Sequence, residues 1–573
     1  MAACFGVCRL HMRGTGRLLK LCPSSDLQAQ WWQSRTSFAT KARAVTKTPQ
    51  TDEVCTKGTF SSIQDERQAQ AERSVLISCP PKINEKKVLN YISKHGDIKN
   101  HFFYQTYGTY AVVEFFNRES IAALTEDCTI PSIQHEAPVP FKSRLLTLKW
   151  TGAGRQPNVP TTLKCHEMSP PPINELVQQL SRQESIDQQL RYLTEVYQLT
   201  EENISLRFLV CSLLRDTAAA YFPECIIRPF GSSVNSFGKL GCDLDMFLDL
   251  DGVIGQNQTQ SSGMSLEYQV KRVGSERNVT QSILSVISEC VDHFSPGCVG
   301  VQKILNARCP LVRFSHQPSG FQCDLTANNR VAMKSSELLF VYGSLDARVR
   351  HLLFTVRCWA RVHGITSNIP GAWITNFSLT MLVVFFLQQR TPALLPTLDQ
   401  LRDLADPSDK CVIEGNDCTI VSDLSKIKLE ENTDTLETLL LEFFEFYGSF
   451  AFKKSSINIR KGKEQNKPEA AALYIQNPFE PQLNVSKNVN AAQLERFVTL
   501  CQDSSWLLQN REVQKQSAAQ SAGQVPAWGM AALLLPSSGK LKGNTKAKRR
   551  PTKVTIKKLL QSLKSSVEDA GQK

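Results

Sequence analysis

The chain has 573 residues, of which 41% are apolar and 21% are charged, a composition that suits several folded domains. Wholesale disorder and a collagen-like structure are therefore excluded. The longest apolar stretch, 379–387, is far shorter than the roughly 18–20 residues of a membrane span, so we expect no span.

The positive charge is concentrated at the two ends of the chain. The formal net charge is +12, with +7 in residues 1–50 and +9 in residues 537–573, so residues 51–536 carry −4. A nucleic-acid surface on the folded body must therefore be local. The eighteen cysteines show neither C-x-x-C pairs nor zinc spacing, which predicts core thiols in a reducing compartment.

The first 45 residues are rich in arginine and serine, contain one acid, Asp26, and lack the unbroken apolar core of a secretory signal. This pattern is typical of a mitochondrial transit peptide and predicts import into the matrix, with removal of about the first 40 residues. A disordered basic leader is the alternative interpretation. Residues 46–65 are polar and predict a linker.

Residues 66–150 predict a compact α/β unit. We expect its strands at 75–78 and 107–115 and its helices at 86–94 and 118–124, in a split βαβ arrangement. This order of elements resembles an RNA-recognition motif, which implies an α/β sandwich.

Domains of that kind stack RNA bases on aromatic side chains of two strands. Tyr110 matches one stacking position, whereas Val112 and Leu76 occupy the others, and Gly108 lies where a basic residue is usual. Three roles stay open for the unit: RNA binding, a protein contact or dimerisation, and a passive scaffold.

The remaining chain divides by composition. Residues 151–172 are a proline-marked linker, and 173–345 predict helices followed by an α/β catalytic region. Residues 346–508 are helical, and 509–573 predict a basic, disordered tail. The tail could grip the RNA backbone in a salt-sensitive manner, or it could be merely solvated. We therefore expect an α+β multidomain protein.

The segment from Phe230 to Leu250 carries the chemistry. Gly231 and Ser232 follow a strand-like run, and a glycine there lets backbone N–H groups approach a phosphate. Asp243 and Asp245 follow, and positions i and i+2 of a strand point to one face. Such a pair of carboxylates alone usually lies on a solvated strand face, so its function has to be inferred from the wider pattern.

A third carboxylate, Asp324, lies on a predicted strand, 321–326, that follows the turn 317–320. Three carboxylates on two neighbouring strands can hold two divalent metals about 3.5–4 Å apart, and oxygen ligands suit Mg²⁺ or Mn²⁺. One metal would lower the pKa of an attacking hydroxyl, and the other would hold a triphosphate. Asp324 is the candidate for activating the hydroxyl.

The Gly-Ser pair, the Asp-Leu-Asp run and the later strand aspartate together resemble the nucleotidyltransferase superfamily of DNA polymerase β. From about residue 170 to 500 the chain is similar to the terminal RNA nucleotidyltransferases, the group of poly(A) and poly(U) polymerases. The resemblance implies a polymerase β-like catalytic domain and a helical, poly(A)-polymerase-associated domain. It also implies phosphate contacts from Gly231, Ser232, Gly241 and Cys242, the last through its backbone because serine is usual there.

The resemblance assigns four further side chains to the nucleotide. Asn329 would contact the ribose, and a turn-forming asparagine is the alternative. Arg357 and Arg361, at positions i and i+4 of a helix, would hold the β- and γ-phosphates where the family usually has lysine, unless they form a solvated basic face. Phe377 stands where the family stacks a tyrosine on the base, and a core phenylalanine is the alternative.

Residues 475–485 resemble the family's nucleotide-recognition loop, which implies nucleotide binding by Asn477, Glu480 and Leu483. Members that add uridylate carry a histidine at the position of Leu483, so its absence favours ATP over UTP. Asn477 replaces an aspartate of the family, which leaves base selectivity open.

These assignments predict an enzyme that adds AMP from ATP to RNA 3′ ends without a template, with Mg²⁺ or Mn²⁺, in the polyadenylation of mitochondrial transcripts. A terminal uridylyltransferase and a non-catalytic RNA-binding scaffold are the alternatives. The resemblance also implies a homodimer, which we expect to form through residues 66–150.

Overall fold

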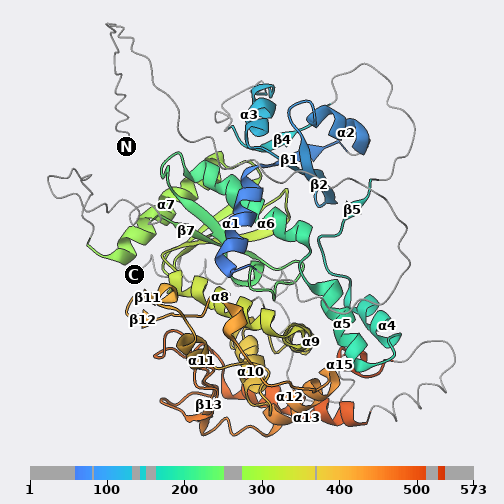
Figure 1. Ribbon diagram of the computed structural model, residues 1–573, viewed down its shortest axis with the longest axis vertical. Coiled ribbons are helices and arrows are strands. Elements are labelled where there is room, and N and C mark those ends of the chain that lie inside the picture. The colour runs from blue at the N-terminus through green and yellow to red at the C-terminus, as the bar shows by residue number, and fades with distance from the viewer. Residues whose placement is uncertain are drawn as a thin grey trace, which may run out of the picture. The chain divides into compact units, whose positions relative to one another are not determined.

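The computed structural model describes residues 58–80, 83–131, 142–149, 163–250, 274–367, 369, 371–510 and 527–535. The chain separates into residues 1–57 and 58–573, so every described residue belongs to the second unit. The expected transit peptide, residues 1–45, lies outside the described residues. Two five-stranded sheets and a large group of helices make up the described chain (Figure 1), which confirms the predicted α+β multidomain fold.

The RNA-recognition-like domain has a sheet of order β4-β1-β3-β2-β5. Its strands are β1 (Ser74–Cys79), β2 (Ile98–Gln105), β3 (Thr109–Phe115), β4 (Leu145–Thr147) and β5 (Cys165–His166), and its helices are α2 (Glu85–Ile92) and α3 (Glu119–Glu126). β1 pairs antiparallel with β3 and parallel with β4, as a split βαβ unit requires. β5 adds a strand from the segment predicted as linker, because its residues pair with β2.

Both faces of this sheet are buried, because consecutive side chains of a strand point to opposite sides. Val75 and Ile77 pack with α2 and α3 in one cluster. Leu76 and Val112 join a different cluster with helix α6 (Glu201–Ala218) and the catalytic sheet. The two positions where an RNA-binding domain carries rings are therefore occupied by core residues.

Two tyrosines of this domain, Tyr104 and Tyr110, also face the catalytic region. Tyr104 and Tyr110 stack with ring centroids 5.6 Å apart and an interplanar angle of 21°. Tyr104 is fully buried, and its hydroxyl donates to the carbonyl oxygen of Pro318 at 3.0 Å. Tyr110 matches a position where an RNA base would stack, but here the ring of Tyr104 stacks on it instead.

The catalytic sheet has the order β6-β7-β10-β9-β8. Its strands are β6 (Ile226–Pro229), β7 (Leu244–Asp249), β8 (Cys298–Ile304), β9 (Leu311–His316) and β10 (Phe321–Ala327). β7 and β10 form a parallel pair, and the other neighbours are antiparallel. Helices α6 and α7 (Glu276–Phe294) pack on the sheet through apolar side chains.

Helix α1 (Phe60–Glu72) begins inside the segment that the sequence predicts as a linker, 46–65. Thr59 caps its first turn through its side chain. The helix packs along α6 and buries Gln64 and Gln68 among few apolar residues. A helix that buries glutamines shows little apolar periodicity, so the sequence pattern does not clearly predict it.

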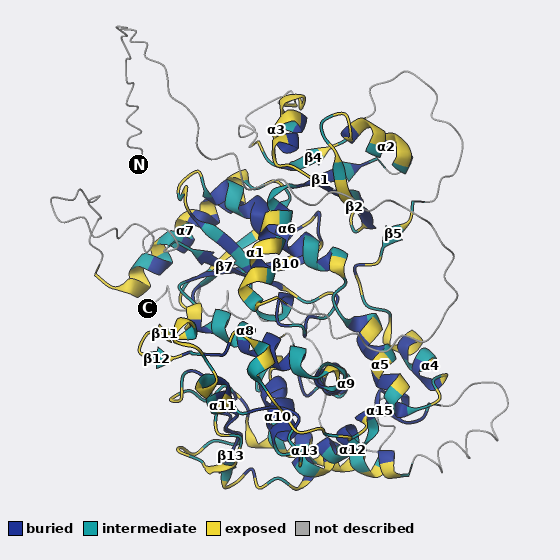
Figure 2. Cartoon of the chain, viewed as in Figure 1, coloured by how far each residue is buried: buried dark blue, intermediate teal, exposed yellow. Residues whose placement is uncertain are grey.

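The helical region surrounds one large core. Its main helices are α8 (Arg330–Leu345), α9 (Ala347–Val362), α10 (Asn376–Gln388), α11 (Leu398–Asp403), α12 (Leu436–Ser449) and α13 (Ala491–Gln509). Short elements link them: η2 (Pro407–Asp409), β11 (Val412–Ile413), β12 (Asn416–Asp417), η3 (Leu424–Lys426), β13 (Ser455–Ser456) and β14 (Gln465–Asn466). Figure 2 shows α10 dark blue, because every residue from Ser378 to Gln388 is buried.

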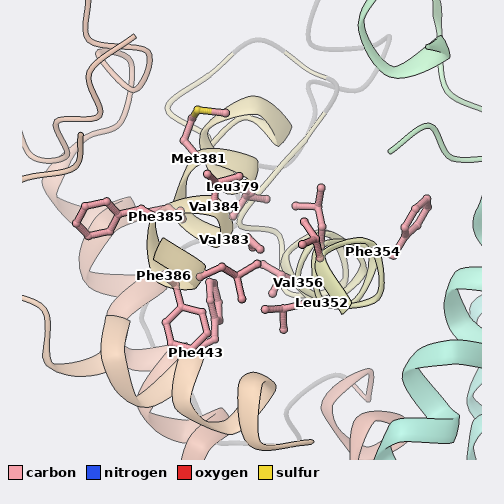
Figure 3. Packing of buried hydrophobic residues seen from close by; sticks show 14 of the residues in the cluster. Leu352, Phe354, Val356, Leu379, Met381, Val383, Val384, Phe385, Phe386 and Phe443 are labelled. Atoms are coloured by element: carbon pink, nitrogen blue, oxygen red, sulfur yellow. The ribbon is translucent and has the colours of Figure 1, made fainter. Parts of the chain in front are cut away.

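Helices α9, α10 and α12 interlock through aliphatic and aromatic side chains (Figure 3). Leu352 and Val356 of α9 lie toward Val383 of α10. Phe386 of α10 meets Phe443 of α12 edge to face, with ring centroids 5.7 Å apart. Edge-to-face pairs of this kind add to the free energy of apolar burial.

Besides α8, three shorter helices join this core from outside the predicted boundaries of 346–508. α4 (Ile173–Ser181) and α5 (Ile186–Tyr197) were expected with the catalytic region, and α15 (Met530–Leu533) lies in the predicted disordered tail. All three contribute to the helical core, and Trp528 donates its ring N–H to the Ser181 carbonyl oxygen at 3.1 Å. An apolar stripe predicts that a helix is buried, but it does not identify the neighbouring helix.

The described ranges contain neither a membrane-spanning helix nor a disulfide. No helix of the described ranges combines the length and the apolar character needed to cross a membrane. The cysteines within those ranges are all free thiols, as the scattered spacing predicts.

We predict that Phe443→Ala lowers the free energy of unfolding by about 3–5 kcal/mol, because it empties a fully buried ring position in the helical core. Urea denaturation of the purified protein measures the change. Phe294→Ala removes a ring that is 42% exposed at the end of α7 and is the matched control, with an expected change below about 1 kcal/mol. Equal effects of the two substitutions would contradict the packing in Figure 3.

Candidate active site

Three aspartates meet on one side of the catalytic sheet. Asp324 of β10 lies directly opposite Asp245 of β7 in the parallel pair, so both side chains leave the same face. Asp243 immediately precedes β7 and lies two residues from Asp245, on that same face. The structure thus brings together the three carboxylates that the sequence singled out.

Burial and mutual repulsion make charge costly in this group. Burial, followed by the charges of Asp324 and Asp243, raises the pKa of the Asp245 carboxyl to about 7. The pKa of Asp243 is also raised, by burial first and by Asp324 second. Arg207 and Arg313 act in the opposite direction on both carboxyls. Clustered carboxylates of this kind are stabilised by a divalent cation.

Arg313 of β9 is the cross-strand neighbour of Asp324. Its Nε and Nη2 donate to Oδ1 and Oδ2 of Asp324 at 2.7 and 2.5 Å, a bidentate ion pair. Within the described part of the chain, no three potential ligands converge as a ready metal cluster, and Asp324 is engaged with the guanidinium. The three carboxylates nevertheless offer the oxygen donors that Mg²⁺ and Mn²⁺ prefer, and the repulsion between them favours a cation there.

The 3-10 helix η1 (Gly231–Ser233) brings backbone close to the carboxylates. Gly231 has φ +63°, a conformation that other residues rarely adopt, and a Cβ there would lie 3.0 Å from Oδ2 of Asp245. Its N–H donates to the Ser336 hydroxyl of α8 at 2.8 Å. Glycine is therefore required at this position, and Ser336 is a support that the sequence did not reveal.

Arg207 of α6 fixes the backbone beneath the site. Its Nη2 donates to the Cys242 carbonyl at 2.7 Å, and its Nη1 donates to the Asp243 carbonyl at 3.0 Å and to the Ser233 hydroxyl at 2.9 Å. The guanidinium lies 4.5 Å from the ring centroid of Phe321. The side chain is fully buried, so it ties the Gly-Ser loop, the Asp-Leu-Asp run and β10 together. In the sequence, the signal for this structural role of Arg207 was an arginine inside an apolar helical run.

A group of basic side chains lies beside Cys242. Lys239 was not among the residues predicted for the site. Its pKa is lowered, by burial first and by the charge of Arg361 second. Arg357 donates from Nη1 to the Phe237 carbonyl at 2.8 Å, and burial lowers its pKa to about 10. The Ser232 hydroxyl donates to the Cys242 sulfur at 3.4 Å. Arg361 is exposed, whereas Arg357 is engaged with backbone.

Asn329 and Phe377 stand at the starts of two helices. Asn329 is the N-cap residue of α8, and its side chain makes no capping bond. The left-handed turn falls on Asn328, which has φ +58° and donates to the Thr280 hydroxyl at 3.0 Å. Phe377 is half-buried and packs against the helical core.

The loop that holds Asn477, Glu480 and Leu483 is shaped by its own hydrogen bonds. Oδ1 of Asn477 accepts the N–H groups of Phe479 and Glu480 at 3.0 and 3.1 Å, and its Nδ2 donates to Glu480 Oε2 at 3.1 Å. The Leu483 carbonyl accepts the Asn477 N–H at 2.8 Å. Arg308, between β8 and β9, donates to Glu480 Oε1 at 3.2 Å, which links the catalytic sheet to this loop.

Known protein families match three successive parts of the chain. Residues 59–129 match the RL domain, and residues 186–344 match the family described as "Poly(A) RNA polymerase, mitochondrial-like, central palm domain". Residues 435–483 match the Cid1 family poly A polymerase. The sheet, the carboxylate group and these matches define a nucleotidyltransferase with a palm domain.

Individual relatives identify the family of this chain more specifically than the family models do. The chain is 58% identical over 512 residues to "Poly(A) RNA polymerase, mitochondrial" of Homo sapiens, which covers 89% of this chain and 87% of the human protein. Crystal structures of mtPAP in complex with ATPγS and with UTP are 54% identical, have TM-scores of 0.79 and 0.78, and cover 83% of this chain and 100% of theirs. The chain belongs to the mitochondrial poly(A) RNA polymerase family, which confirms the predicted terminal RNA nucleotidyltransferase.

We predict that Asp245→Asn stabilises the metal-free protein more at pH 8 than at pH 5, by a difference of about 3 kcal/mol. The folded state keeps a proton on Asp245 up to about pH 7, whereas the unfolded chain releases it near pH 4, so the free energy of unfolding falls as the pH rises between these values. The asparagine removes this loss, on the order of 3 kcal/mol. Urea denaturation in EDTA at both pH values measures it.

Asp249→Asn, at the far end of β7 and paired with Arg330, is the matched control and should give no gain at pH 8. A gain from Asp245→Asn of the same size at both pH values would contradict the electrostatic origin of the effect.

Proposed function

We propose that this chain is a template-independent polymerase that adds AMP from ATP to the 3′ ends of mitochondrial RNA. One observation carries the proposal: Asp243, Asp245 and Asp324 share one face beside the Gly231 loop, in a chain of this family. The RNA 3′-oxygen forms a bond to the α-phosphorus, the bond from that phosphorus to the bridging oxygen of the β-phosphate breaks, and pyrophosphate leaves. Asp324 is the candidate for taking the hydroxyl proton.

The basic group beside the Gly-Ser loop is suited to the triphosphate. Arg361 is exposed and Lys239 lies near it, so both can donate to phosphate oxygens. Ser232 and the backbone of Gly241 and Cys242 add neutral donors. Arg357 reaches the phosphates only by leaving the Phe237 carbonyl, and in its present position it supports the loop from below.

Asp243, Asp245 and Asp324 would hold Mg²⁺ or Mn²⁺, and the bound ions supply the positive charge that compensates the triphosphate and lowers the pKa of the attacking hydroxyl. Arg207 keeps the backbone of Cys242 and Asp243 in place, so the ligand Asp243 projects from a fixed main chain. Fixed ligands reduce the reorganisation that the reaction requires.

The recognition loop is the part of the site suited to choosing the base. Leu483 offers an apolar side chain where uridylate-adding relatives offer histidine, which favours ATP over UTP. Asn477 acts by shaping the loop, because its side chain is bonded to Glu480 and to backbone. Asn329 contacts the ribose and Phe377 stacks on the base in this proposal. The uridylate-adding and non-catalytic alternatives receive no support from relatives named poly(A) RNA polymerase.

The family name places the enzyme in the mitochondrion, and we propose residues 1–45 as the transit peptide that directs it to the matrix. The basic residues of 509–573 outside the described part serve as a non-specific grip on RNA backbone. A homodimer forms through residues 66–150, where Tyr107 and Phe116 are 84% and 59% exposed. Exposed aromatic side chains are typical of protein interfaces.

We predict that Asp243→Ala lowers the rate of RNA extension by about 10³-fold or more, because it removes charge stabilisation worth several kcal/mol. A short 3′-hydroxyl RNA with Mg²⁺ and one nucleoside triphosphate at a time gives the measurement. Ladders are expected with ATP and should disappear with EDTA. Asp249→Asn is the carboxylate control and should extend RNA. Ladders chiefly with UTP would contradict the assignment of the base.

We predict that Phe116→Glu converts a dimer into a monomer, because a charge at an apolar interface is costly to desolvate. Sedimentation or light scattering of the full chain measures the mass. Tyr221→Glu, at a position 61% exposed in the catalytic region, is the control and should leave the mass unchanged. Deleting residues 66–150 is unsuitable, because Leu76 and Val112 are part of the catalytic core. An unchanged mass for Phe116→Glu would contradict this interface.

A further inference from the structure

The strand order lines up the parts of the site across the sheet. The Gly-Ser loop follows β6, Asp243 directly precedes β7 and Asp245 lies in it, Asp324 belongs to β10, and Arg313 belongs to β9. Asp245, Asp324, Arg313 and Gln302 are successive partners in register, so their side chains occupy one row on one face.

This order separates the two ends of the reaction. In phosphoryl transfer the attacking and leaving oxygens lie roughly in line on opposite sides of the phosphorus. Ser232 follows β6 and bonds to Cys242, and Lys239 and Arg361 lie near the same cysteine, so this group suits the leaving pyrophosphate. The acceptor RNA must therefore enter from the other side, over β10 and β9.

We propose that Arg313 binds the RNA 3′ end: its guanidinium holds Asp324 before a divalent ion binds, and it turns to an RNA phosphate once Asp324 is a metal ligand. The inference rests on the proposed function, because it takes the three aspartates as the metal site. The bidentate pair occupies both oxygens of Asp324 and places a positive charge beside them, so Arg313 and a metal ion compete for this carboxylate.

The surroundings of Arg313 suit an RNA backbone. The Arg313 side chain is 47% exposed although its Nε and Nη2 are engaged by Asp324. Along this face the neighbouring side chains are uncharged and polar: Gln322 and Ser315 bond to each other at 2.7–2.9 Å, and Gln302 lies one strand further out. A guanidinium released there is the charged donor closest to Asp324, and guanidinium groups bind phosphate bidentately.

Lys303 provides a matched control on the next strand. Its partner in register, Val312, is buried, and its ammonium group pairs with Glu289 of α7, so it lies on the opposite face of the sheet. Lys303→Gln removes one charge and one ion pair, as Arg313→Gln does, but away from the carboxylates.

The first test measures Mn²⁺ binding to the full chain without RNA, by electron paramagnetic resonance at pH 8. Arg313→Gln should bind Mn²⁺ about two- to fivefold more tightly, because no ion pair has to be broken. Lys303→Gln should bind as the unchanged protein does. An unchanged or weaker affinity of Arg313→Gln would overturn the proposal.

The second test measures extension kinetics and RNA affinity. Arg313→Gln should raise KM for RNA about five- to tenfold, leave KM for ATP within about twofold, and reduce the slope of log affinity against log salt by about 1. Arg313→Lys keeps the charge and should recover part of the RNA affinity. An RNA KM and a salt slope equal to those of Lys303→Gln would overturn the proposal.

Asp243→Ala separates this inference from the proposed function. It should abolish tight Mn²⁺ binding while Arg313→Gln strengthens it. If Asp243→Ala binds Mn²⁺ normally, the proposed metal site fails, and the Arg313 inference fails with it. If Asp243→Ala loses Mn²⁺ but Arg313→Gln behaves as the unchanged protein does, only the Arg313 inference fails.

Discussion

The parallel pairing of β7 with β10 is the constraint on which the rest of the site depends, because it sets Asp245 and Asp324 side by side. Burial first, and repulsion by the other two carboxylates second, raise the pKa of Asp245. Two nearby arginines reduce this cost. Arg207 contributes its charge while bonding to the Asp243 backbone, and Arg313 contributes its charge while forming a bidentate pair with Asp324.

The RNA-recognition-like domain is part of this arrangement. Its sheet places Leu76 and Val112 in the same cluster as strands of the catalytic sheet, and Tyr104 bonds to Pro318 in the turn that leads into β10. A surface that binds bases in similar domains has become an internal contact here. The domain therefore helps to hold the β9–β10 hairpin from which Asp324 projects.

The sequence predicted those parts of the site that lie in short motifs. The glycine at 231, the Asp-Leu-Asp run and Asp324 carry their chemistry locally, so spacing was sufficient. Arg313 was within reach of the same reasoning, because the predicted turn at 317–320 makes 316 and 321 partners and therefore 313 and 324 partners. Arg207 was visible as a charge in an apolar helix, but its bonds depend on backbone folded far along the chain. The placement of α4, α5 and α15 was not predictable, since burial patterns do not specify a partner.

The catalytic sheet and the helical region meet at the candidate site, and two hydrogen bonds connect them there. The catalytic sheet supplies carboxylates and the Gly-Ser loop, whereas the helical region supplies Arg361 and the recognition loop. Arg308 bonds to Glu480 across this boundary, and Gly231 bonds to Ser336 of α8. Both contacts involve residues of the candidate site, so the packing of the two regions and the geometry of the site depend on each other. In the proposed function, these contacts hold the recognition loop at 477–483 in a fixed position relative to the carboxylates.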